Sequence, residues 1–132
     1  PKPQNPKFMN LPFLIKSIND SIFNRNKTKD KQRLAINAMT RLRCLNSDNA
    51  IDFTYKSDLN NIPDSLTPWF DIKTKNTRRE FIISGHWSAI GIQKHNYGIT
   101  LDTGCVWGGK LSAYCIESGS LVSVISDPRD LL

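Results

Sequence analysis

The sequence has few of the features that membrane-spanning and zinc-binding proteins need. Its 132 residues include three cysteines, Cys44, Cys105 and Cys115, and no two of them form a CxxC pair, so the spacing excludes a zinc knuckle. No apolar run approaches the ~18 residues of a membrane helix, so we expect no membrane partner. We recognise no signal peptide and expect reduced thiols in a cytoplasmic protein. The chain starts at Pro1 rather than Met, so we expect a longer translation product.

Familiar catalytic motifs are also missing. The sequence contains no GxSxG, no HExxH, no paired catalytic carboxylates and no GKS/T of a Walker loop. Cys105 has no histidine near it in sequence to act as a base. The only two histidines are His86 and His95, so a metal bound here must draw further ligands from elsewhere. We therefore predict no catalytic residue in the chain by itself.

The composition is that of one soluble globular domain with an excess of positive charge. Hydrophobic residues make up 39% and charged residues 23% of the chain, and 18 Lys and Arg oppose 12 Asp and Glu, a net charge of +6. This excess suits an anionic partner such as a nucleotide, a polyphosphate or a nucleic acid. A merely basic surface would have the same composition.

The predicted elements are helices first and strands later. Four of the seven prolines lie in residues 1–13, which favours a loop, and apolar spacing predicts helices over 14–23 and 32–45 with a basic loop at 24–31. The second helix should bury a stripe of Ala35, Ala38, Met39, Leu42 and Leu45. Strands are expected at 51–55, 81–83, 99–101, 110–117 and 121–125, with loops at 56–68 and 73–79 and a hairpin turn at 118–120.

Two of these strands end in polar and glycine residues, which is where ligands are usually held. His86 follows the strand at 81–83 and is a candidate metal ligand, although a lone loop histidine is more often not one. His95 lies in a polar turn and should be exposed. Asp102 follows the next strand; it can orient a ligand, bind metal or, as the more common case, cap its own turn. The glycines at 104, 108 and 109 could form a phosphate nest with Thr103.

Three further side chains stand out. Trp107 stands among glycines and would offer a stacking face to a nucleobase, but plain core packing explains it equally well. Arg41 and Arg43 lie on the polar side of the predicted helix, near its C-terminal end. There they form a cationic face beside the apolar stripe, and complementing the helix dipole is the structural explanation for both.

These residues carry a resemblance to a known family. Ser84-Gly85-His86-Trp87 and the string LDTGCVWGGKL at 101–111 resemble the C-terminal part of the bacterial symmetrical diadenosine tetraphosphatases, which are calcineurin-like metallophosphoesterases. NAMTRLR at 37–43 is similar to the family's NAFTRMR helix. YKS at 55–57 followed by PWF at 68–70 is similar to its YSK…PWF order. The resemblance covers about 34–125.

The resemblance implies an activity and a site. Members hydrolyse diadenosine tetraphosphate to two ADP with two divalent cations, often manganese or cobalt, that activate water and clamp phosphate. By this resemblance His86 is a metal ligand, Arg41 and Arg43 contact phosphate, and Trp107 and Asp102 lie at the substrate. The implied fold is α+β, the C-terminal half of an α/β sandwich, with N-terminal helices followed by a mostly antiparallel strand meander. The whole of 1–132 is then part of one domain, divided into a helix and basic loop at 1–31 and a helix with strands at 32–132.

The chain also departs from the family's pattern. The motifs GDxHG, GDxxxRG, GNHD and HAG, which supply most metal ligands and the acid, do not occur in it. We therefore expect the N-terminal portion of the same enzyme to be a partner, a dinucleoside polyphosphate to be the substrate, and the chain alone to be inactive. No DNA partner is expected on this reading. The alternative is a non-catalytic nucleotide- or nucleic-acid-binding remnant that keeps the basic surface without the metal centre.

Overall fold

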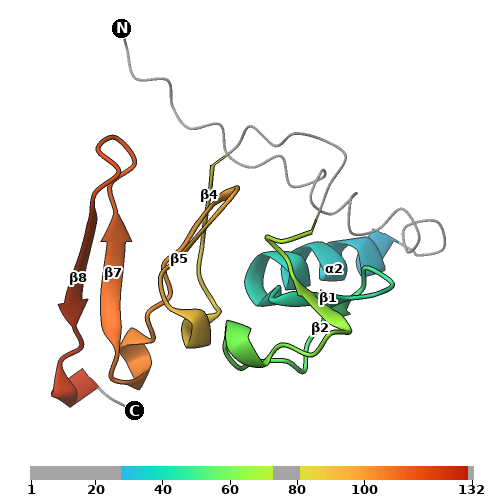
Figure 1. Ribbon diagram of the computed structural model, residues 1–132, viewed down its shortest axis with the longest axis horizontal. Helices are drawn as coiled ribbons and strands as arrows, with labels where there is room; N and C mark the ends of the chain where they lie inside the picture. Colours follow the sequence, from blue (N-terminus) through green and yellow to red (C-terminus); the bar gives the residue numbers. More distant parts are fainter. Residues whose placement is uncertain (1–27, 73–80, 131–132) are drawn as a thin grey trace, which may run out of the picture.

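The computed structural model describes residues 28–72 and 81–130, in which one helix precedes three small sheets (Figure 1). The helix α2, Thr28–Arg41, lies at one end of the molecule beside the first sheet. The hairpin of the last two strands lies at the opposite end, with the second sheet between them (Figure 1). The mixture of helix and strands agrees with the predicted α+β class. The helix predicted at 14–23 and the loop predicted at 73–79 lie outside the described residues.

Helix α2 begins and ends four residues earlier than the sequence predicts. Residues 28–31 were expected in a loop and are helical, whereas Cys44 and Leu45 were expected in the helix and belong to a strand. Pairing explains the early end, because β1, Cys44–Asn46, is the central strand between β2, Ile51–Asp52, and β3, Leu66–Pro68, both antiparallel to it. Tertiary pairing of this kind readily overrides local helix propensity. The expected strand at 51–55 is therefore only two residues long, and the expected loop at 56–68 contains β3.

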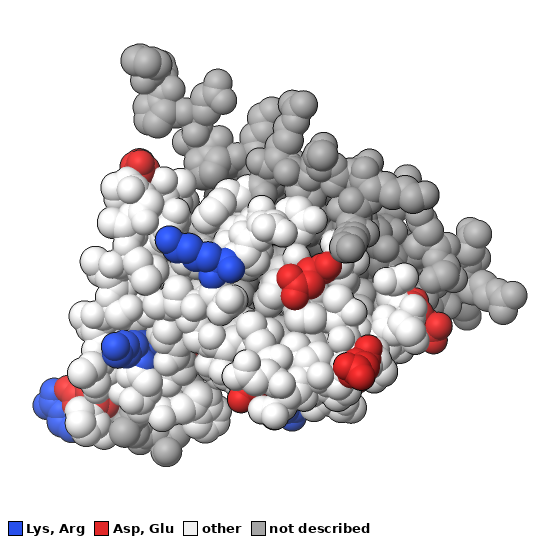
Figure 2. Space-filling view, viewed as in Figure 1, with Lys and Arg blue, Asp and Glu red and all other residues white. Residues whose placement is uncertain are grey.

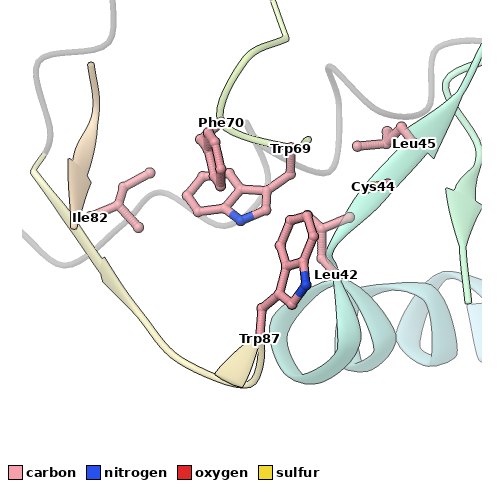
Figure 3. Packing of buried hydrophobic residues seen from close by; sticks show 7 residues of the cluster. All are labelled: Leu42, Cys44, Leu45, Trp69, Phe70, Ile82 and Trp87. Atoms are coloured by element: carbon pink, nitrogen blue, oxygen red, sulfur yellow. The ribbon is translucent and has the colours of Figure 1, made fainter. Parts of the chain in front are cut away.

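The core lies where helix α2, the first sheet and the second sheet meet. Its buried cluster consists of Leu42, Cys44, Leu45, Trp69, Phe70, Ile82 and Trp87. In Figure 3 the aromatic rings fill the centre of this cluster, with Ile82 on one side and Leu45 and Cys44 on the other. The Trp69 and Phe70 rings meet edge to face with centroids 5.6 Å apart, a favourable aromatic geometry. The predicted role of Trp69-Phe70 as a core anchor is confirmed.

The second sheet has the order β4-β6-β5. Strand β4, Ile82–Ser84, is parallel to β6, Gly98–Thr100, which is antiparallel to β5, Gln93–His95. The prediction of a connector at 94–98 missed β5. The buried Thr100 hydroxyl donates to the Gly91 carbonyl at 2.8 Å and accepts from the Gln93 amide at 3.1 Å, so this buried polar group is satisfied.

The third sheet is a two-stranded hairpin. Strands β7, Lys110–Tyr114, and β8, Leu121–Ile125, pair antiparallel in the register Lys110 with Ile125 through Tyr114 with Leu121. Strand β8 matches the prediction, whereas β7 ends three residues earlier than expected, so the turn predicted at 118–120 is part of a longer connection at 115–120. The Tyr114 ring stacks on Phe81 at 5.6 Å, which ties the hairpin to the residue before β4.

Short 3₁₀ turns complete the described chain: Leu59–Asn61, Ser88–Ile90, Cys105–Trp107 and Pro128–Asp130. The last of them lies in the tail that was expected to be loop. Of the helices in the described residues, none has the length and apolar character needed to cross a membrane.

Candidate functional site

The predicted site residue His86 lies at the end of β4, where the strand meets the C-terminal part of helix α2. Arg41 and His86 both line a cavity of about 300 Å³ between these two elements. The backbone of His86 has φ of 73°, a left-handed conformation that non-glycine residues seldom adopt. Such conformations persist only where the surrounding structure enforces them, and they are concentrated at functional sites.

The neighbouring Trp87 enforces the conformation of this loop. Trp87 is 2% exposed and its indole Nε1 donates to the Ser57 carbonyl at 2.8 Å, across 30 residues of chain. The Tyr55 ring meets the indole edge to face at 6.3 Å. The buried indole therefore fixes the loop on the core and leaves the adjoining His86 at the surface.

The structure brings four of the five predicted site residues into one electrostatic group. Partial burial lowers the pKa of the His86 imidazole below its usual 6.5; the positive charges of Arg43 and Arg41 lower it further, and Asp102 acts in the opposite direction. The imidazole is therefore neutral at pH 7, which is the form that can bind a metal. Beneath this group, Asp102 lies against Gly85, since a Cβ placed on Gly85 would be 3.7 Å from that of Asp102.

Arg43 carries a buried nitrogen without a partner. Its Nε is inaccessible to solvent and has no hydrogen-bond acceptor among the described residues. Its carbonyl accepts from the Trp69 amide at 3.0 Å, so its backbone is fixed to the start of the Trp69-Phe70 pair. Buried polar groups in native proteins are nearly always paired, so an anionic oxygen or a water is the natural partner for this guanidinium.

Asp102 does cap its own turn, the more common of its predicted roles. Its Oδ1 accepts from the Gly104 amide at 3.1 Å. Gly104 and Gly108 have φ of 68° and 88° on either side of the 3₁₀ turn at 105–107, so only glycine fits both positions without strain. The loop is closed by its own amides: Trp107 and Gly109 donate to the Gly104 carbonyl, Gly108 to Cys105 and Lys110 to Thr103, at 2.9–3.1 Å. The amides of Gly108 and Gly109 are therefore not available for the predicted phosphate nest, and the Gly104 amide already donates to Asp102, so that hypothesis is wrong for all three glycines.

Two other predictions are decided by exposure. Trp107 is 75% exposed, so the core-packing alternative is wrong and its ring is available at the surface. His95 was expected to be exposed in a polar turn, and this is wrong. Its ring stacks on Phe70 with centroids 4.9 Å apart and meets Trp69 at 5.2 Å, because β5 turns it against the aromatic core.

Sequence reasoning missed the walls of the cavity. Met39 was assigned to the buried stripe but is 49% exposed and lines the cavity, as does Ile83, which is 40% exposed. Only the packing of α2 against β4 brings these two residues to the same cavity. The sequence carried no signal for it, because Ile82 and Ile83 are both apolar although one is buried and the other exposed.

Comparison with known proteins identifies the relatives. The chain is 44% identical over 101 residues to the symmetrical bis(5'-nucleosyl)-tetraphosphatase of Methylobacillus flagellatus, a match covering 76% of this chain and 36% of the relative. Corresponding proteins of Nitrosomonas europaea and Ralstonia nicotianae are 37% identical over 108 residues and 48% over 84 residues, covering 40% and 29% of the relatives. The chain is homologous to part of the symmetrical bis(5'-nucleosyl)-tetraphosphatases. It spans about a third of the length of these tetraphosphatases, and no protein-family profile matches it.

The expected metal site and the basic surface suggested by the composition can both be compared with the described residues. These residues contain no group of three or more His, Cys, Asp or Glu side chains that could surround a metal ion. Figure 2 shows Lys and Arg scattered among Asp and Glu, without a continuous basic surface on the described part of this face. Beside the cavity, the positive charges that act on His86 are those of Arg43 and Arg41.

Proposed function

We propose that this chain is part of a hydrolase that cleaves diadenosine tetraphosphate into two molecules of ADP. The relatives that share a third or more of their residues with it over the matched stretch are named symmetrical bis(5'-nucleosyl)-tetraphosphatases. The observation that carries the proposal is that Arg41 and His86 line one cavity, while the charge of Arg43 acts together with that of Arg41 on the His86 pKa. Two guanidinium groups beside a neutral imidazole suit a polyphosphate and its counter-cation.

The residues have separate roles in this proposal. Arg41, exposed at the cavity, and Arg43, with its unpaired buried Nε, would bind phosphate oxygens. Asp102 would orient the His86 loop and the glycine turn from beneath, because it already caps that turn and lies against Gly85. Trp107 would contact the substrate from the rim, where its exposed ring can stack on a base.

The resemblance also implies two divalent cations, manganese or cobalt, which the described residues fit only in part. His86 is accessible, neutral at pH 7 and next to the carboxylate of Asp102, so it suits one ligand position. Two donors do not make a cation site, and no third joins them in the part of the chain that the structure describes. We therefore assign this chain one metal ligand and derive no reaction step through the metals.

The hairpin supports a role for further polypeptide. Opposite residues of an antiparallel pair point to one face, so the register places Leu111, Ala113, Val122 and Val124 together. All four are exposed, and within the paired residues of β7 and β8 this face carries no polar side chain. The other face bears Ser112, whose hydroxyl bonds those of Thr103 and Ser123 at 2.8 Å, and Tyr114, which stacks on Phe81. We propose that the apolar face packs on the N-terminal portion of the same enzyme, as one layer of a sandwich.

The alternative is a non-catalytic nucleotide-binding protein. The lack of a ligand group among the described residues fits both proposals, because the hydrolase would take most of its metal ligands from further polypeptide. The cavity beside Arg41 and His86 and the scattered surface charge favour a small phosphorylated ligand over DNA in either case. We place both functions in the cytoplasm, in keeping with three cysteines that are all free thiols.

A titration with Mn²⁺ tests the proposal. ADP release from diadenosine tetraphosphate is followed with the chain alone while the Mn²⁺ concentration is raised. We expect no turnover above the buffer rate, together with ADP binding that Arg41→Gln weakens about tenfold, since charge-assisted hydrogen bonds contribute about 1.5–3 kcal/mol. Turnover comparable with that of the Methylobacillus flagellatus relative would show that the chain needs no further ligands. Absence of ADP binding would remove the phosphate-binding role.

A further inference from the structure

The cavity that holds Arg41 and His86 on one side is otherwise mostly apolar. Its volume is about 300 Å³, at the small end of the range for ligand pockets. It lies between the last turns of α2 and strand β4, so one wall is helical and the other is a strand. Six apolar side chains line it: Ala38, Met39, Leu42, Trp69, Ile82 and Ile83. A pocket of this size accepts one ring system rather than a whole dinucleotide.

The apolar lining is divided into a buried floor and an open rim. Ala38, Trp69 and Ile82 are 7–8% exposed and belong to the packed interior. Met39 and Ile83 are 49% and 40% exposed and line the pocket from the helix and from the strand. The exposed Met39 side chain leaves apolar surface in water, which a flat apolar ligand would cover. Met is also well suited to contact an aromatic ring through its polarizable sulfur.

Polar groups occupy one side of the pocket. Arg41 and His86 line it there, and Ser84 lines it with a buried hydroxyl that has no partner among the described residues. The Thr40 hydroxyl, also at the lining, is already bonded to the Ile36 carbonyl at 2.8 Å. A ligand with one apolar ring system and an adjoining chain of negative charge matches this division between an apolar and a cationic part.

We propose that this pocket binds one nucleobase of the nucleotide substrate, with the attached phosphates passing Arg41 and His86. The inference rests on the proposed function and assigns the base to the α2–β4 pocket instead of the exposed ring of Trp107. Affinity for the base comes from apolar contact with Met39 above the buried floor of the pocket. The cationic side holds the phosphates, so the two contributions can be measured separately.

The experiment uses the full chain labelled with [¹³C]methyl methionine, which gives two resonances, from Met9 and Met39. The Met39 resonance is assigned by its loss in Met39→Leu. ADP and inorganic pyrophosphate are titrated in separate samples. We expect ADP to move the Met39 resonance saturably through the ring current of the base, and pyrophosphate to leave it within a tenth of that shift.

A matched pair of variants completes the test. Met39→Ser and Ile36→Ser both remove an exposed apolar side chain from helix α2, but only Met39 lines the pocket. We expect Met39→Ser to weaken ADP binding about fivefold, as loss of some 40 Å² of apolar contact predicts, while pyrophosphate binding and the Ile36→Ser variant stay unchanged.

Other outcomes separate this inference from the proposed function. If both ligands bind equally tightly and Met39→Ser weakens neither, the nucleobase pocket is refuted while the phosphate site stands. If Ile36→Ser weakens ADP as much as Met39→Ser, the effect comes from the helix and the pocket is also refuted. If neither ligand binds to the chain, both the pocket and the phosphate-binding role are wrong.

Discussion

Replacing Gly98 with alanine should separate the strand that carries His86 from its neighbour. Gly98 is the first residue of β6 and lies opposite Ile82 of β4 in the parallel register, with φ of +154°. A Cβ at this position would lie 1.8 Å from the Ile82 carbonyl oxygen and 2.7 Å from the Ile82 carbonyl carbon and nitrogen. Real Cβ contacts essentially never fall below 3.0 Å, and the obstructing atoms are backbone, so the strands must move apart by about 1 Å or more.

The cost follows from what such a movement breaks. The Ile82 amide donates to the Tyr97 carbonyl at 2.7 Å and the Leu101 amide to the Ser84 carbonyl at 2.8 Å, and both bonds join β4 to β6. Each contributes about 1 kcal/mol, and the buried Ile82 and Ile99 would lose packing as well. We expect Gly98→Ala to lower the free energy of unfolding by about 3–5 kcal/mol, among the largest effects of single substitutions.

Gly91→Ala is the matched control. Gly91 also has a positive φ, +61°, but a Cβ there would meet nothing within 4 Å. Only the backbone penalty should remain, about 1–3 kcal/mol, because φ of 61° with ψ of −143° is a conformation that residues other than glycine seldom adopt. Urea denaturation followed by tryptophan fluorescence compares the two variants. Equal losses for both, or a loss below 2 kcal/mol for Gly98→Ala, would refute the close β4–β6 contact.

Two further predictions concern Cys44 and the hairpin. Burial raises the pKa of the Cys44 thiol to about 11, with Asp52 acting in the same direction and Arg43 opposing it. Since the unfolded thiol ionises near 9 and the folded one near 11, the free energy of unfolding should fall across this interval by about 2 kcal/mol. In urea melts over the same pH interval, the free energy of unfolding of Cys44→Ala should not show this fall. An equal pH dependence in the variant and in the parent chain would contradict the prediction. On the hairpin, Val122→Asp should abolish ADP release when this chain replaces the matched segment of the Methylobacillus flagellatus relative. Ile125→Asp, on the opposite face and 77% exposed, should retain it; equal activities would exclude the apolar face as an interface.

The sequence predicted the elements whose signals are local. The hairpin of β7 and β8 was found because Ser118-Gly119-Ser120 marks its turn, and Gly119 indeed has φ of +69°. Helix α2 was found from its apolar spacing, although its end was misplaced. The strand residues Cys44 and Leu45 fit a helical stripe equally well, and only their pairing with β2 and β3 decides between the two.

The site shows the same division between local and long-range information. Asp102 and Gly104 form a turn that neighbouring residues determine, and this was among the predicted alternatives. The cavity depends on residues more than 40 positions apart, because Met39 from α2 and Ile83 from β4 meet only after folding. No spacing rule within either segment reports that contact. His95 was misplaced for the same reason, since its partners Trp69 and Phe70 come from another sheet.

The most direct test of the account removes the His86 imidazole in a complete enzyme. The matched segment of the Methylobacillus flagellatus relative is replaced by this chain, and ADP release from diadenosine tetraphosphate is measured as Mn²⁺ is raised. We predict an active chimera in which His86→Ala lowers the rate about 100-fold or more and raises the Mn²⁺ concentration needed. The control His95→Ala should leave that Mn²⁺ requirement unchanged, because its ring packs on Phe70 instead of lining the cavity. A His86→Ala chimera with the parent's rate and Mn²⁺ requirement would contradict the account.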